Sequence, residues 1–138
     1  MRHYFSLFLT LLLAFSLTTC SKEDKESVIE EDLTSLYEAR IVGTWEYIRS
    51  SNYKITITFF GGGSFKEITE DSSIKYHKSE ISGKYYITKD AKGKYLLYEY
   101  KDSRFGYVPV EINFSTDYNE LRYVYESGGG ATYRRVNK

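Results

Sequence analysis

Our prediction of the fold starts from the segment Ile41-Val42-Gly43-Thr44-Trp45-Glu46-Tyr47-Ile48. It contains the only tryptophan of the 138 residues, and from Val42 onward the side chains that would share one face of a strand recur at every second position. Such alternation predicts a β-strand with one buried face. A helix-like segment precedes the stretch and many similar strands follow it, so we expect an all-β domain over residues 41–138.

The chain after this stretch reads as short strands separated by turns. Further candidate strands cover residues 53–59, 64–70, 74–81, 84–88, 94–100, 107–114, 121–126 and 131–136, which makes about nine in all, with turns about every 8 to 12 residues. Two triple-glycine segments, 61–63 and 128–130, read as hairpin turns. Ser82-Gly83 reads as a break between strands, and Pro109 as an edge or bulge position. We expect an antiparallel meander, as a sandwich or, preferably, as an up-and-down barrel that leaves no exposed edge.

The first nineteen residues read as a lipoprotein signal peptide. A basic start is followed by a mostly apolar run from Tyr4 to Leu17, which suits a signal-peptide core and is short for a membrane span. The run ends at Leu17-Thr18-Thr19-Cys20, which resembles a bacterial lipobox with Thr19 in the place where Gly, Ala or Ser is usual. We expect cleavage before Cys20, lipidation of Cys20 and attachment to the outer membrane through this anchor. The alternative is an incidental cysteine behind an ordinary signal peptide.

Residues 20–27 read as a flexible charged tether, since the segment 21–26 has no apolar residue. This segment resembles the acidic stretch after the lipidated cysteine of surface-exposed lipoproteins of Bacteroidota. The cell surface and the periplasmic face of the outer membrane both stay open as locations.

Residues 28–40 are predicted to form a short helix, with Ser27 as its cap and Glu30 completing a capping box. The apolar residues of this segment share one helical face: Ile29, Leu33, Leu36 and Tyr37. We expect this face to pack across one end of the β domain. The alternative is a helix that binds a partner.

Charge and composition argue against several functions. The formal net charge is zero, and −1 once residues 1–19 are removed, so the chain lacks the basic field that nucleic-acid binding needs. Cys20 is the only cysteine, which rules out a metal cluster built on cysteines. His77 is the only histidine beyond the signal peptide and reads as an exposed strand residue. The acidic residues are scattered, so we expect no catalytic residue, no metal, no cofactor and no enzymatic activity.

Three features resemble the small lipocalin-like domains of Bacteroidota lipoproteins, over about residues 41–136. Gly43-Thr44-Trp45 opens the first strand, Gly-rich turns join the strands of segments 58–65 and 82–87, and Tyr133-Arg134-Arg135-Val136 closes the chain. In lipocalins the tryptophan of this motif plugs the closed end of the barrel, and an arginine of the last strand packs across it. The resemblance implies that Trp45 and Arg135, or Arg134 if the phase differs by one, close the barrel through a cation–π contact of about 0.5–2 kcal/mol.

Two functions follow as expectations. The first is a lipid-anchored outer-membrane lipoprotein whose lipocalin-like barrel binds a small apolar or amphipathic ligand. A barrel of short strands leaves room for a small cavity only. The residues expected to line that cavity are Ile55, Ile57, Tyr98 and Ile112.

The second is a solid-core barrel or sandwich that contacts a protein or a glycan at the cell surface. Its basis is the high tyrosine content: the 15 tyrosines occur at both strand parities, so some of them point outward or into a cavity. Ordinary cross-strand packing also accounts for such tyrosines. A cavity inside the barrel would favour the first function, and a packed interior with an outer aromatic patch would favour the second.

Overall fold

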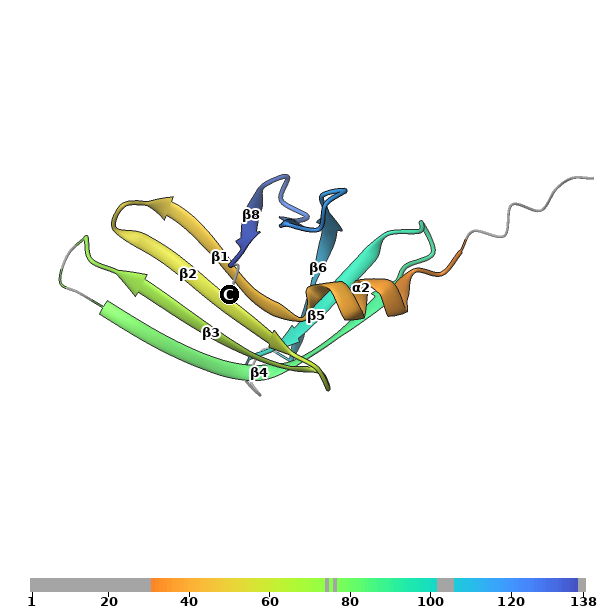
Figure 1. Ribbon diagram of the computed structural model, residues 1–138, viewed down its shortest axis with the longest axis horizontal. Coiled ribbons are helices and arrows are strands. Elements are labelled where there is room, and N and C mark those ends of the chain that lie inside the picture. Colours follow the sequence, from red (N-terminus) through yellow and green to blue (C-terminus); the bar gives the residue numbers. More distant parts are fainter. Residues whose placement is uncertain (1–30, 74, 76, 102–105, 137–138) are drawn as a thin grey trace, which may run out of the picture. The chain divides into compact units, whose positions relative to one another are not determined.

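The computed structural model describes residues 31–73, 75, 77–101 and 106–136, so the predicted signal peptide, Cys20, the tether, Ser27 and Glu30 lie outside the described part. Helix α2 (Thr34–Ile41) is followed by eight strands. They are β1 (Gly43–Ser50), β2 (Tyr53–Phe60), β3 (Ser64–Asp71), β4 (His77–Lys89), β5 (Tyr95–Tyr100), β6 (Tyr107–Phe114), β7 (Glu120–Val124) and β8 (Gly130–Arg135). Consecutive strands pair antiparallel and β8 pairs with β1, which closes the barrel. The predicted all-β lipocalin-like barrel with a short helix is confirmed, and the sandwich alternative is wrong (Figure 1).

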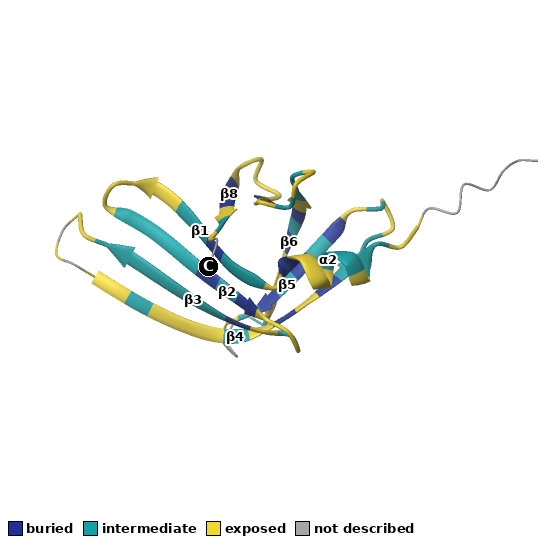
Figure 2. Cartoon of the chain, viewed as in Figure 1, coloured by how far each residue is buried: buried dark blue, intermediate teal, exposed yellow. Residues whose placement is uncertain are grey.

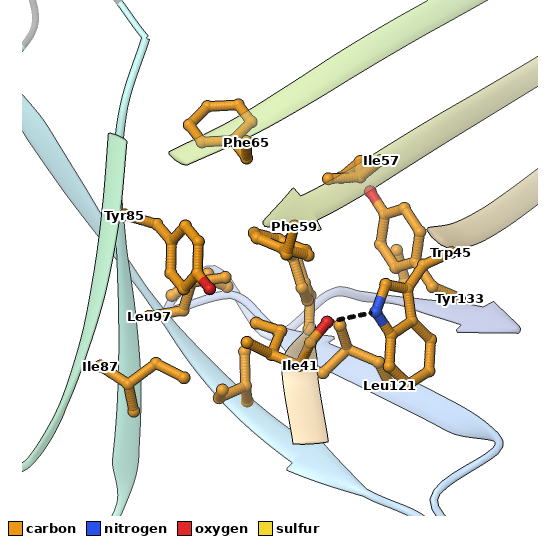
Figure 3. Packing of buried hydrophobic residues seen from close by; sticks show 14 of the residues in the cluster. Ile41, Trp45, Ile57, Phe59, Phe65, Tyr85, Ile87, Leu97, Leu121 and Tyr133 are labelled. Carbon is orange, nitrogen blue, oxygen red and sulfur yellow. Dashed lines mark hydrogen bonds between the residues drawn. The ribbon is translucent and has the colours of Figure 1, made fainter. Parts of the chain in front are cut away.

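The core of the barrel follows from the alternation along each strand. On β2, for example, Ile57 and Phe59 are buried while the residue between them is not. Figure 2 shows the buried residues gathering where the strands pass closest to α2, and Figure 3 shows them packed around Ile41. The cluster consists of Ile41, Trp45, Ile57, Phe59, Phe65, Tyr85, Ile87, Tyr95, Leu97, Val110, Ile112, Leu121, Tyr123, Ala131 and Tyr133. One end of the barrel is therefore solid.

Helix α2 covers this solid end, as predicted, but it starts later than residue 28. Residues 31–33 are not helical, and the carboxylate of Asp32 accepts a hydrogen bond from the backbone N–H of Thr34 at 3.0 Å. That bond satisfies the first backbone donor of the helix, whereas Leu33 at the N-cap position makes no capping hydrogen bond through its side chain. Tyr37 stacks on Tyr95 at 4.0 Å, and the helix ends on the fully buried Ile41.

The predicted strands 74–81 and 84–88 form one continuous strand, β4, so the predicted break at Ser82-Gly83 is wrong. Gly83 pairs with Phe65 of β3 inside the ladder. A Cβ atom at Gly83 would lie 2.1 Å from the carbonyl oxygen of Tyr100 and 2.7 Å from the ring of Phe65. This glycine therefore permits a close approach within a strand, one of the roles that glycine has in strands besides ending them.

The barrel wall is incomplete at the end opposite α2. Strands β1 and β8 pair only at Trp45 with Arg135 and at Glu46 with Arg134, and Figure 1 shows β8 diverging from β1 beyond that point. Pairing of β6 with β7 begins only at Glu111, so Pro109 pairs with β5 on one side and has no β7 partner on the other. The short β7–β8 hairpin thus leaves an opening in the wall.

Candidate functional site: a cup at the open end of the barrel

A cavity of about 380 Å³ occupies the open end of the barrel. Residues of β2, β3, β6, β7 and β8 line it, together with β5 and the residue that follows it. Its apolar wall includes Ile55, Val108, Pro109 and Val110. We call this cavity the cup. Its size lies within the range of small-molecule sites, which are mostly apolar with a few placed polar groups.

Three charged side chains meet in the cup. The ammonium of Lys101 lies 2.5 Å from Oε2 of Glu67 and 3.4 Å from Oε2 of Glu99. The hydroxyl of Tyr123 donates a hydrogen bond of 2.9 Å to Oε1 of Glu99. Glu99 is buried, with 7% of its surface exposed, so its charge depends on these two partners. With both carboxylates ionised, the two carboxylates and one ammonium leave the cluster with a formal charge of −1.

The pKa directions in the cluster reflect burial and the excess of carboxylate. Burial raises the pKa of Glu99, and the ammonium of Lys101 and the hydrogen bond from Tyr123 offset only part of that rise. Burial alone would lower the pKa of Lys101, but Glu99 and Glu67 outweigh it, so the pKa is raised and the ammonium stays charged. Burial and the neighbouring Glu99 raise the pKa of Tyr123 well above its ordinary value.

Tyr133 gives the cup a polar atom that no described residue engages. Only 4% of this residue is exposed, and its ring lies 4.8 Å from that of Tyr123 and 5.5 Å from that of Tyr47. Its hydroxyl makes no hydrogen bond to another residue in the described ranges, and Figure 3 shows the hydroxyl pointing away from Leu121. Burial, and then the charges of the groups around the cup, raise the pKa of Tyr133.

The structure places the four residues of the predicted ligand cavity in three different environments. Only Ile55 lines the cup; Ile57 and Ile112 are 1% and 0% exposed within the solid core. Tyr98 lies on the outer wall, where it stacks on Tyr86 at 4.7 Å with an interplanar angle of 5°. The expectation that these four residues share a cavity is therefore wrong.

The reason for the error lies in strand β5, which is apolar or aromatic on both parities. Its inward residues are Tyr95, Leu97 and Glu99. Because this face contains a glutamate, it is less hydrophobic than the opposite face, so hydrophobicity alone predicts the wrong face to point inward. Sequence reasoning accordingly missed the polar residues of the cup. The alternation of the strands could have identified them, because residues two positions apart share a face. Glu67 shares a strand face with Phe65, and Glu99 shares one with Leu97.

The closed end of the barrel holds the predicted closure residues. The guanidinium carbon of Arg135 lies 4.1 Å from the centroid of the Trp45 ring, and Trp45 Nε1 donates a 2.7 Å hydrogen bond to the carbonyl of Ile41. Arg134 points outward, with 82% of its side chain exposed, and lies 3.6 Å from Glu120. Of the two candidate arginines, Arg135 is the one that faces Trp45.

Arg135 also binds three backbone carbonyls, two of them around the end of α2 and one in the turn between β6 and β7. It donates hydrogen bonds to the carbonyl of Tyr118 at 3.2 Å, to that of Val42 at 3.0 Å and to that of Arg40 at 2.5 Å. Gly43 makes room for it: the glycine has φ +136°, and a Cβ there would lie 2.7 Å from Nη1 of Arg135. We call Gly43, Trp45 and Arg135 the closure cluster. It ties the helix, the first strand and the last strand together.

A second aromatic feature lies on the outer wall of β4, β5 and β6. Besides the stacked pair of Tyr86 and Tyr98, Tyr107 contacts Tyr86 at 5.0 Å and Tyr100 at 5.1 Å between ring centroids. Tyr86 and Tyr107 are 43% and 44% exposed. We call these four residues the tyrosine patch.

His77 is exposed at the start of β4. Within the described ranges, no three His, Cys, Asp or Glu side chains are grouped so that they could hold a metal ion. The described part of the chain also contains no helix with the length and apolar character needed to cross a membrane. Comparisons of the chain with protein-family models, with curated proteins and with solved structures gave no match.

Proposed function

We propose that this protein is a lipid-anchored outer-membrane lipoprotein whose barrel holds a small amphipathic ligand in the cup. The observation that carries the proposal is the cup itself: an opening of about 380 Å³ with an apolar wall beside a buried, charged cluster. A filled barrel would need neither the cavity nor the burial of Glu99, which costs free energy through desolvation. The proposal names no catalytic residue, metal or cofactor.

Native mass spectrometry tests ligand binding. The full-length chain in lipid nanodiscs is incubated with an envelope lipid extract and examined for a discrete adduct. Ile55→Phe narrows the cup and is expected to abolish the adduct. Ile48→Phe is the matched control, since Ile48 is 65% exposed on the neighbouring strand and the same change there leaves the cup intact. An adduct that survives Ile55→Phe, or no adduct at all, would count against a ligand in the cup.

The membrane anchor rests on the lipobox-like segment Leu17–Cys20. Acyl chains contribute about 0.8 kcal/mol of membrane affinity per buried methylene, so two chains suffice for stable attachment. Cells fed an alkyne-tagged fatty acid should therefore label the wild-type chain and leave Cys20→Ala unlabelled. Equal labelling of the two chains, or recovery of the wild type with residues 1–19 still attached, would refute the anchor while leaving the cup untouched.

The tyrosine patch supports a second candidate function, contact with a glycan or a protein at the cell surface. Exposed tyrosines provide large, rigid contact area together with a hydroxyl group. If this is the function, full-length protein should bind members of a glycan array, and Tyr107→Ser should lose that binding while Ile55→Phe keeps it. Identical array signals from wild type and Tyr107→Ser would exclude the patch as the glycan contact.

A further inference from the structure

We propose that the cup selects a ligand with a protonated amine head group, which binds beside Glu67 and the hydroxyl of Tyr133 while its short apolar tail lies against Ile55 and Val110. This inference rests on the proposed function, because it assumes that the cup holds a ligand. It adds the chemistry of the head group, which the apolar wall alone does not specify.

The first argument is the charge that the cluster leaves uncompensated. Lys101 contacts Oε2 of both Glu67 and Glu99, and Tyr123 occupies Oε1 of Glu99. Oε1 of Glu67 has no partner among the described residues, although only 12% of that side chain is exposed. The unpartnered Oε1 of Glu67 therefore remains at the wall of the cup, and with Glu99 ionised the cluster also carries one uncompensated negative charge there. A ligand ammonium supplies both the charge and the N–H donors that this atom lacks.

The second argument is independent and concerns Tyr133. Tyr133 lines the cup and is 4% exposed, and its hydroxyl has no hydrogen-bond partner within the described ranges. Among the described residues no side-chain polar atom is both fully buried and unpartnered, so this hydroxyl keeps accessible surface that a ligand can contact. Glu67 and Glu99 lie near enough to contribute to its raised pKa, so the hydroxyl stays protonated and neutral. Its oxygen can accept a hydrogen bond from an ammonium. A carboxylate or phosphate head would instead face the two glutamates, and such like-charge contact opposes binding.

The third argument is size. A cavity of about 380 Å³ has the volume of about a dozen water molecules. The wall beside the charged cluster is apolar, with Ile55, Val108 and Val110 in contact with the space. A short alkyl or aryl amine fits this volume and this wall, whereas a whole diacyl lipid is too large to be enclosed.

Three probes with the same tail and different heads test the inference: hexylammonium, hexanol and hexanoate. Their affinities for the full-length chain in lipid nanodiscs are measured by isothermal titration calorimetry, with empty nanodiscs as the blank. We expect hexylammonium to bind at least about tenfold more tightly than hexanol, and hexanoate to bind most weakly. Hexanol that binds as tightly as hexylammonium would overturn the inference while leaving an apolar ligand cup intact. If none of the three binds, the inference and the proposed function both fail.

Matched variants assign the preference to its residues. Glu67→Gln keeps the size of the side chain and should reduce the preference for hexylammonium over hexanol to less than about threefold. Tyr133→Phe should weaken hexylammonium several-fold and change hexanol less. Glu80→Gln is the control, since Glu80 lies on the outer wall with 51% of its side chain exposed. An ammonium preference that persists in Glu67→Gln, in a variant whose thermal midpoint matches wild type, would refute the assigned site.

Discussion

Arg135→Ala is the change that tests the closed end of the barrel most directly. The guanidinium stacks on Trp45 at 4.1 Å and donates hydrogen bonds to the carbonyls of Arg40, Val42 and Tyr118. The β1–β8 ladder has only two residue pairs, Trp45 with Arg135 and Glu46 with Arg134, so the side chain of Arg135 adds substantially to the connection between the first and last strands.

The expected magnitude follows from these contacts. A hydrogen bond to a charged group contributes about 1.5–3 kcal/mol when it is well shielded. Two of the three carbonyl contacts of Arg135 are exposed, and water can replace them, so we count well under 1 kcal/mol for each. Adding the partly buried bond to Tyr118 and a cation–π contact of about 0.5–2 kcal/mol, we expect Arg135→Ala to lower the free energy of unfolding by about 3 kcal/mol.

Urea unfolding followed by circular dichroism measures this loss, and Arg134→Ala is the matched control. Arg134 is the neighbouring arginine on the same strand, but it points outward, so its removal should change the free energy of unfolding by less than about 0.5 kcal/mol. Equal effects of the two variants would refute the closure by Arg135.

A double-mutant cycle checks the contact itself. Gly43→Ala introduces a Cβ that would lie 2.7 Å from Nη1 of Arg135. The alanine should therefore cost less in the Arg135→Ala background, although the strain of φ +136° remains there. If the changes in the free energy of unfolding add to within about 0.3 kcal/mol, residue 43 and the side chain of Arg135 are not in steric contact.

Three further predictions concern the wall, the plug and the buried acid. Gly83→Ala should lower the free energy of unfolding, measured by urea titration, by about 2 kcal/mol, because the new Cβ would lie 2.1 Å from a backbone oxygen. Gly61→Ala is the control and should be nearly neutral, since open space surrounds that residue. Similar losses in the two variants would contradict the close contact between Gly83 and its neighbouring strand. Trp45→Phe should cost about 2–4 kcal/mol by calorimetry, since it removes ring volume and leaves the carbonyl of Ile41 without its 2.7 Å donor, and a loss below about 1 kcal/mol would argue against the plug. The pKa of Glu99 is raised by burial, so the folded chain holds this proton above the ordinary value of 4.5, and the stabilisation present below that pH is lost as pH rises through the raised pKa. Glu99→Gln should remove this decline when wild type and variant are unfolded in urea at several pH values, and parallel pH profiles would contradict the direction of the shift.

Local patterns along the chain predict the fold class, and the resemblance to lipocalins adds the closed end of the barrel. Alternation from Val42 onward and the glycine turns at 61–63 and 128–130 are local signals, and each acts within a few residues of chain. These local signals were sufficient to predict an antiparallel meander of strands. The closure cluster was predicted through the resemblance of the Gly-X-Trp opening and the final arginines to lipocalins, and the structure selects Arg135 over Arg134 as the residue that faces Trp45.

The content of the open end follows from the tertiary structure. Alternation tells which residues share a face, but on β5 both faces carry large apolar or aromatic side chains, and closure of the barrel determines which one points inward. That choice buried Glu99 and placed Tyr98 outside. It also brought Lys101 to Glu67, which is 34 positions away on a strand that is not its neighbour. A contact across the interior depends on the curvature and register of the whole sheet, and no local pattern of residues encodes those.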